Sequence, residues 1–122
     1  MRRVISIVFA LVAALGVTAS TAAAETGVTA KTVTIGGTFP LTGPASGYAP
    51  IPVAMKAYFS YINSRRGTDG KRGVLGRQIV FKYLDDGYNP ANSVQLTRQL
   101  VEQDKVFAVV GSLGTEVNLA IR

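Results

Sequence analysis

Hydrophobic positions along this chain change their spacing several times, and each change predicts a different element. Residues 32–39 (TVTIGGTF) carry β-branched side chains and run into two glycines, which predicts a strand. In residues 78–84 (QIVFKYL), Ile79, Phe81 and Tyr83 alternate with Val80, Lys82 and Leu84, which predicts a second strand. Residues 105–110 (KVFAVV) are almost wholly apolar, as is typical of a short strand in a sheet that is covered on both faces.

Two helices are predicted between these strands and a third after them. Residues 51–66 have apolar side chains at helical spacing, with Pro52 tolerated in the first turn and Gly67 as a natural stop. We expect its buried face to consist of Ile51, Ala54, Tyr58, Tyr61 and Ile62. The next helix, residues 90–104, has Asn89 as its N-cap. We expect its buried face to consist of Val94, Thr97, Leu100 and Val101. The last helix begins at Thr115, its expected N-cap.

The resulting element order is β-α-β-α-β-α, which predicts parallel strands joined by right-handed crossovers. We expect an α/β fold with a three-layer parallel sheet of the flavodoxin or Rossmann type. Its strand order would be second-first-third, with helices on both faces. Three strands leave two sheet edges exposed, and the last helix has no stop signal. We therefore expect this chain to be the N-terminal piece of something longer.

The first 24 residues have the organisation of a secretory signal peptide. Met1-Arg2-Arg3 is basic, residues 4–17 are uncharged and apolar, and residues 18–24 are small, with Ala22-Ala23-Ala24 as the cleavage site. An uncleaved anchor is the alternative, because the uncharged stretch of 21 residues is long enough to span a bilayer. Its second half inserts weakly, so we expect cleavage after Ala24, a periplasmic location and no stable membrane insertion afterwards.

Composition removes several kinds of chemistry. The chain contains no His and no Cys, which excludes a His-based catalytic triad, a thiolate nucleophile, a disulfide and a His- or Cys-ligated zinc within it. We expect no cofactor, no metal and no catalytic residues. The formal net charge of +6 falls to +4 if residues 1–24 are removed.

Two loops follow strands at the edge where parallel α/β sheets bind ligands. The first, residues 40–50, contains Ser46, Gly47 and Tyr48. The second is Gly111-Ser112-Leu113-Gly114-Thr115, where hydroxyls and free helical N–H groups suit a carboxylate or another anion. The alternative is that Ser112 and Thr115 only cap a helix and that the glycines only form a turn.

Asp85 and Asp86, at the end of the second strand, have two interpretations. They could be a pair of acid/base carboxylates or a magnesium site. Two adjacent side chains at a strand end point in different directions, however. We therefore expect a turn in which the carboxylates accept hydrogen bonds from nearby backbone N–H groups.

Five of the basic residues fall within 13 positions: Arg65, Arg66, Lys71, Arg72 and Arg77. Nucleic-acid binding is one interpretation, but no aromatic residue interleaves the cluster and the protein is expected to be exported. We expect no nucleic-acid partner. The cluster is better interpreted as a solvated connection or as a surface that docks an acidic partner.

Three strings together resemble one family of transport proteins. They are PLTGPASG after the first strand, DDGYNP before the second helix, and LVEQDKVFAVVGSLGT leading into the third strand and its loop. With the export signal, they resemble the periplasmic substrate-binding proteins of ABC transporters, of the branched-chain amino-acid (leucine-binding-like) family. The resemblance covers residues 32–122. It implies the first lobe of a type I periplasmic binding protein, of which residues 25–122 are an incomplete N-terminal part, and a second lobe that closes over a small ligand.

The resemblance also implies ligand contacts, which are Ser46, Gly47, Tyr48, Ser112, Leu113, Gly114 and Thr115. Amino-acid binders of the family often have a Ser/Ala-Ser-Thr pattern after the third strand, and GSLGT departs from it. Amino acids, amides and aromatic acids therefore all stay open as ligands. The implied function is the solute-binding component of an ABC importer for amino acids or related small carboxylates or amides, with permease subunits as partners.

One other function stays open as an alternative, and a third lacks the residues that it needs. A ligand-sensing ectodomain of a signalling receptor would be favoured by an uncleaved anchor. An exported α/β hydrolase needs a G-x-S-x-G elbow and a His, and this chain has neither.

Overall fold

The computed structural model describes residues 25–122, so the predicted signal peptide lies outside the described residues. Three parallel strands form one sheet in the order β2-β1-β3, which confirms the predicted topology. The strands are β1 (Thr32–Phe39), β2 (Gln78–Asp85) and β3 (Ala108–Val109). β1 and β2 pair from Thr32 with Gln78 to Phe39 with Asp85, so their carboxyl ends reach the same edge of the sheet.

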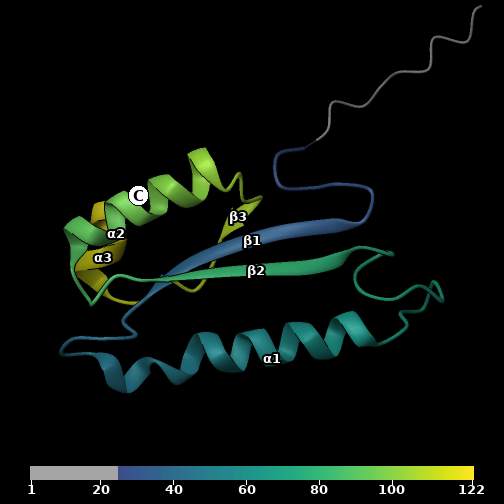
Figure 1. Cartoon of the computed structure of the whole chain (residues 1–122), viewed down its shortest axis with the longest axis horizontal. Helices are drawn as coiled ribbons and strands as arrows, with labels where there is room; N and C mark the ends of the chain where they lie inside the picture. Colours follow the sequence, from purple (N-terminus) through teal and green to yellow (C-terminus); the bar gives the residue numbers. More distant parts are fainter. Residues whose placement is uncertain (1–24) are drawn as a thin grey trace, which may run out of the picture.

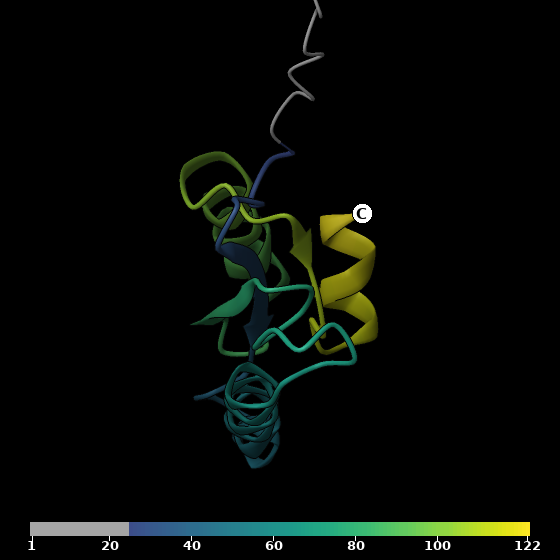
Figure 2. The same ribbon diagram turned by 90° about the vertical axis from the view of Figure 1, so that its right-hand side faces the viewer.

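Helices cover both faces of this sheet, as predicted (Figures 1 and 2). α1 (Pro50–Ser64) covers one face, and a short 3₁₀ helix, η1 (Ser46–Tyr48), precedes it. α2 (Pro90–Arg98) and the π-helical turn η2 (Gln99–Gln103) cover the other face. α3 (Thr115–Ile121) packs beside α2, near β3. Among residues 25–122, no helix is both long and apolar enough to cross a membrane.

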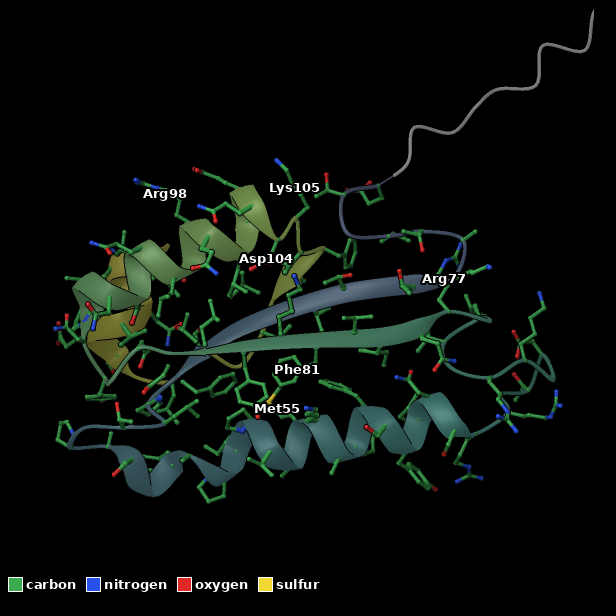
Figure 3. All side chains as sticks on the ribbon, in the orientation of Figure 1. Met55, Arg77, Phe81, Arg98, Asp104 and Lys105 are labelled. Atoms are coloured by element: carbon green, nitrogen blue, oxygen red, sulfur yellow. The ribbon has the colours of Figure 1, made fainter. Side chains whose placement is uncertain are left out.

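The aromatic core between α1 and the sheet is built by the strands' inward side chains. Phe39 is fully buried, and its ring lies edge-on to Phe81 at 6.2 Å and to Tyr83 at 6.5 Å between centroids. Phe59 of α1 meets Phe81 at 5.2 Å. Figure 3 shows Met55 of α1 directed toward Phe81.

The predicted buried face of α1 is wrong for most of its residues. Ile51 and Ala54 are exposed, and Tyr58 and Tyr61 keep 60% and 49% of their surface exposed. The face toward the sheet consists instead of Pro52, Met55, Phe59 and Ile62. Both sets recur at helical spacing and differ by one position, and the packing of Phe59 on Phe81 selects the second.

Asn63 holds the C-terminal end of α1 against the start of β2. Its side chain donates to the Ile79 carbonyl and accepts from the Ile79 N–H, both at 2.8 Å. Arg65 is already extended, with φ −86° and ψ 153°, so α1 ends before the Gly67 stop that the sequence predicts.

On the other face, Leu100 is fully buried over Gly36, where a Cβ atom would lie 2.8 Å from its Cδ2. Asn89 caps α2 as predicted, accepting a hydrogen bond from the Ala91 N–H at 2.9 Å. Val101, which was expected to be buried, is 48% exposed. The wider turn of η2 changes the phase of the helix at this point, because its hydrogen bonds span five residues.

β3 is shorter than predicted. Residues 105–110 were expected to be extended, but Lys105 has φ 52°, in the left-handed region, so the strand does not include it. Backbone hydrogen bonds from Phe107 to Thr34 and from Val110 to Gly36, both 2.7 Å, still hold this segment against β1.

Candidate ligand-binding site

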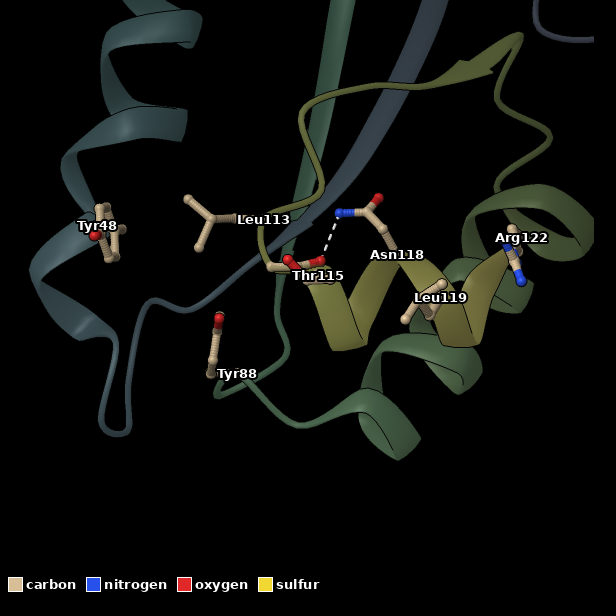
Figure 4. Close-up of a pocket in the computed structure, with 8 residues that line it drawn as sticks. Tyr48, Tyr88, Leu113, Thr115, Asn118, Leu119 and Arg122 are labelled. Atoms are coloured by element: carbon tan, nitrogen blue, oxygen red, sulfur yellow. Dashed lines mark hydrogen bonds between the residues drawn. The ribbon is translucent and has the colours of Figure 1, made fainter.

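The carboxyl ends of the strands border a hollow of about 700 Å³ (Figure 4). It is formed by η1, the loop after β2, the loop after β3 and the exposed side of α3. Its lining residues are Tyr48, Tyr88, Leu113, Gly114, Thr115, Asn118, Leu119 and Arg122. Two tyrosines and two leucines give it apolar walls, while Thr115, Asn118 and Arg122 supply polar groups.

Asp85 fastens the loop after β1 to the end of β2. One carboxylate oxygen accepts hydrogen bonds from the backbone N–H groups of Leu41 (2.9 Å), Thr42 (3.1 Å) and Gly87 (3.0 Å). The other accepts from the Thr42 hydroxyl at 2.7 Å. The Thr42 hydroxyl, with the backbone donors, lowers the pKa of Asp85 below its ordinary value of 3.8, because these bonds favour the charged carboxylate.

Asp86 points the other way and is fully buried. It accepts hydrogen bonds from the Tyr88 N–H and the Ser93 hydroxyl, both at 2.9 Å. The predicted turn is therefore confirmed, because both carboxylates accept hydrogen bonds from nearby backbone N–H groups. The first bond supports Tyr88 in a left-handed conformation, with φ 60°, at the edge of the hollow.

The loop after β3 is fixed by side chains on both sides. The Ser112 hydroxyl lies 3.4 Å from the Thr38 hydroxyl and so faces β1. Asn118 of α3 donates to the carbonyls of Ser112 (3.0 Å) and Gly114 (2.7 Å), the second bond being the dashed line in Figure 4. The loop thus presents a defined backbone to the hollow.

Gly114 is the N-cap of α3, and it has φ 116°. A Cβ atom here would lie 2.7 Å from the Tyr88 ring, so the absence of a side chain lets the two loops meet. Thr115 was expected to be the N-cap, and that prediction is wrong by one position, because Thr115 is the first residue of the helix. No side chain caps α3, so neither Ser112 nor Thr115 acts as its cap.

The structure brings four of the seven predicted site residues together around the hollow: Tyr48, Leu113, Gly114 and Thr115. Ser46 and Gly47 lie in η1, exposed beside Tyr48 but outside the lining. Ser112 turns toward Thr38 instead.

Sequence reasoning missed four lining residues, which are Tyr88, Asn118, Leu119 and Arg122. The last three recur with Thr115 at helical spacing, so the i, i+3, i+4, i+7 pattern carried a signal for them. Tyr88 follows the Asp85-Asp86 turn, at the carboxyl edge of the sheet.

Comparisons with known proteins identify the family. A family profile described as periplasmic binding protein matches residues 32–122. No curated protein matches the chain. The substrate-binding protein of a branched-chain amino acid transporter from Streptococcus pneumoniae, solved with isoleucine, is 29% identical over 75% of this chain and 25% of that one, with a TM-score of 0.64.

Two further solved structures are similar. The fatty acid ABC transporter substrate-binding protein from Thermomonospora curvata is 32% identical over 80% of this chain and 23% of that one, with a TM-score of 0.64. An ABC transporter solute-binding protein from Rhodopseudomonas palustris BisB5, in complex with 3,4-dihydroxybenzoic acid, is 31% identical over 73% of this chain and 23% of that one, with a TM-score of 0.59.

This chain spans about a quarter of the length of these solved relatives. Its three strands, in the order β2-β1-β3 with flanking helices, match the lobe of a type I periplasmic binding protein, as the sequence predicted. With the profile match over residues 32–122, the chain belongs to the periplasmic binding protein family of ABC transporter substrate-binding proteins.

Proposed function

We propose that the complete protein is the extracytoplasmic solute-binding component of an ABC importer for amino acids or related small carboxylates or amides. The observation that carries this proposal is the hollow at the carboxyl ends of the strands, in a chain of this family. Ligands of open parallel sheets bind at this edge, where loops and helix N-termini converge. Import requires binding and release by this component and no catalytic step.

The polar groups of the hollow support a ligand with a carboxylate. No Asp or Glu is among its lining residues, whereas Arg122 adds a positive charge. The Thr115 hydroxyl takes part in none of the hydrogen bonds found within residues 25–122, so it is free to donate to a ligand. The first N–H groups of α3 lack partners within the helix, and they also favour a negative charge.

The apolar walls support a hydrophobic body next to that carboxylate. Tyr48 and Tyr88 are both exposed at the rim, and Leu113 lies between their loops. The ligands named for the solved relatives are isoleucine, a fatty acid and 3,4-dihydroxybenzoic acid, which differ in shape but all carry a carboxyl group. A carboxylate subsite in this lobe, with specificity set elsewhere, accounts for that shared feature.

The proposal extends to the parts of the protein outside the described residues. A second lobe would close over the hollow and exclude water, and the closed form would dock on permease subunits. Residues 1–24 would direct export and be removed. N-terminal sequencing of the exported protein should then begin at Glu25, whereas retention of Met1 would support an anchor.

Calorimetry on the complete protein with matched ligand pairs tests the carboxylate subsite. Isoleucine is compared with isoleucinamide, and 3,4-dihydroxybenzoic acid with its amide. For whichever acid the protein binds, we expect its affinity to exceed that of the matching amide by roughly 10- to 150-fold. A hydrogen bond to a charged group is worth about 1.5–3 kcal/mol, which gives this range. Equal affinity for acid and amide would contradict the subsite, and saturable binding of no small carboxylate or amide would contradict the proposed function.

A further inference from the structure

The positive charge of the described residues is concentrated in the connection between α1 and β2. We call residues 65–77 the basic hairpin. It contains five basic residues and one acidic residue, Asp69, whereas the rest of residues 25–122 contains six of each sign. The net charge of +4 on the described residues therefore lies entirely in this hairpin.

These cations are not neutralised by neighbouring carboxylates. The ion pairs found within residues 25–122 are Lys82–Asp104 and Arg98–Glu102, both outside the hairpin. Arg66 donates to the Gly70 carbonyl at 2.6 Å and Arg77 to the Thr29 carbonyl at 2.8 Å, which fixes their positions and leaves their charges uncompensated. Arg65 lies over the Tyr61 ring, 5.2 Å from its centroid.

Two exposed apolar residues, Val74 and Leu75, lie in a tight turn of the hairpin. Val74 and Arg77 exchange two backbone hydrogen bonds, of 2.8 and 3.0 Å, around Leu75 and Gly76. Both central residues have positive φ, 52° at Leu75 and 83° at Gly76, as in a type I′ turn. Asn, Asp or Gly usually occupies the first central position, so Leu75 is there at a conformational cost. Its side chain is nevertheless 70% exposed.

The hairpin lies at the amino ends of β1 and β2, at the opposite end of the sheet from the hollow (Figure 1). Arg77, labelled in Figure 3, marks its junction with β2. The proposed ligand therefore does not account for this surface.

We infer that the basic hairpin docks the protein on the anionic surface of a phospholipid bilayer. Cations and exposed apolar residues in one hairpin match the two layers of such a surface, because Lys and Arg bind the phosphate headgroups while Leu75 and Val74 enter the acyl boundary. An acidic protein would satisfy the charges and would leave the exposed leucine without a role.

Vesicle co-sedimentation of the full-length exported protein tests this inference. Vesicles of phosphatidylcholine alone are compared with vesicles that also contain phosphatidylglycerol. All variants keep the same N-terminus, so any contribution from residues 1–24 is constant. Lys71→Gln with Arg72→Gln removes two hairpin charges, and neither side chain makes a hydrogen bond within the described residues. Lys56→Gln with Lys105→Gln is the matched control, because both lysines are exposed and lie outside the hairpin.

We expect the protein to bind only the vesicles that contain phosphatidylglycerol, and we expect raised salt to weaken this binding. Loss of the two hairpin charges should reduce partitioning about 25-fold, since each basic residue near an anionic surface contributes about fivefold. The control pair should leave most of the binding intact. Equal losses in the two pairs, or no binding to phosphatidylglycerol, would overturn the inference.

The variant Leu75→Asn distinguishes docking on a bilayer from docking on an acidic protein. Asn tolerates the left-handed conformation better than Leu, so this variant should fold at least as well as the parent chain. We expect a five- to tenfold loss of vesicle binding, about the effect of withdrawing part of a leucine side chain from the acyl boundary. A polyglutamate peptide and glycerol phosphate serve as competitors. Unchanged vesicle binding of Leu75→Asn, or equal binding to polyglutamate, would identify a purely electrostatic surface and refute the bilayer docking.

Discussion

The two adjacent aspartates at the end of β2 have different structural roles. Asp85 is exposed and fastens the loop after β1, whereas Asp86 is buried and supports Tyr88 and Ser93. Successive side chains of a strand point in opposite directions, so one sequence pair serves two loops. The border of the hollow therefore depends on carboxylates that do not line it.

Asp85→Asn should remove part of the acid sensitivity of the protein. The pKa of Asp85 is lowered in the folded state, so its contribution to stability is present above the ordinary carboxyl pKa of 3.8 and is lost as the pH falls through the folded-state value. The variant should be less stable at neutral pH and should lose less stability on acidification. Denaturant unfolding across pH measures this, with exposed Asp69→Asn as the control. If the parent chain and Asp85→Asn lose the same amount of stability as the pH falls, this role of Asp85 is contradicted.

Gly114→Ala should destabilise the loop after β3. Its φ of 116° is unfavourable for any residue with a Cβ, and that atom would lie 2.7 Å from the Tyr88 ring. We expect a loss of about 1–3 kcal/mol in the free energy of unfolding. Gly47→Ala is the matched control, because nothing lies within 4 Å of its added Cβ, and it should change stability by no more than about 0.5 kcal/mol. Similar effects of the two substitutions would refute the close contact of the two loops.

At the scale of elements, the strand and helix order could be predicted because local signals agreed. β1 was predicted to the residue, and Asn89 caps α2 as expected. The face of α1 could not be predicted, because two apolar sets at helical spacing compete, and only the rings of β2 decide between them. Three of the four missed residues of the hollow share one side of α3 at helical spacing, whereas Tyr88 joins them only through tertiary packing of the loop after β2 against α3.

Phe59→Ala and Tyr58→Ala distinguish the two faces of α1. Phe59 packs on Phe81 in the core, so its loss should cost about 2–3 kcal/mol, below the roughly 3–5 kcal/mol that is typical of a fully buried phenylalanine. Tyr58 is 60% exposed, so its loss should cost less than about 1 kcal/mol. Denaturant unfolding of both variants gives the comparison. A larger loss for Tyr58→Ala would restore the face that the sequence alone predicted.

At the scale of the whole molecule, the sheet has two different ends. The carboxyl ends of the strands carry the hollow with its apolar walls and polar groups, and the amino ends of β1 and β2 carry the basic hairpin. A parallel sheet with aligned strands produces this separation, because the loops before and after the strands leave from opposite edges. Ligand binding and surface docking would therefore be independent, and variants at one end should leave the other unchanged.

The central claim is that the hollow at the start of α3 binds the ligand, and the affinity of Thr115→Ala in the complete protein tests it most directly. Calorimetry with a carboxylate ligand that the parent protein binds gives the measurement, and Thr68→Ala, at the opposite end of the sheet, is the control. We expect Thr115→Ala to weaken binding by roughly 10- to 150-fold, the value of one hydrogen bond to a charged group, with little change in the free energy of unfolding. Unchanged affinity in Thr115→Ala, with or without a loss of stability, would contradict the claim.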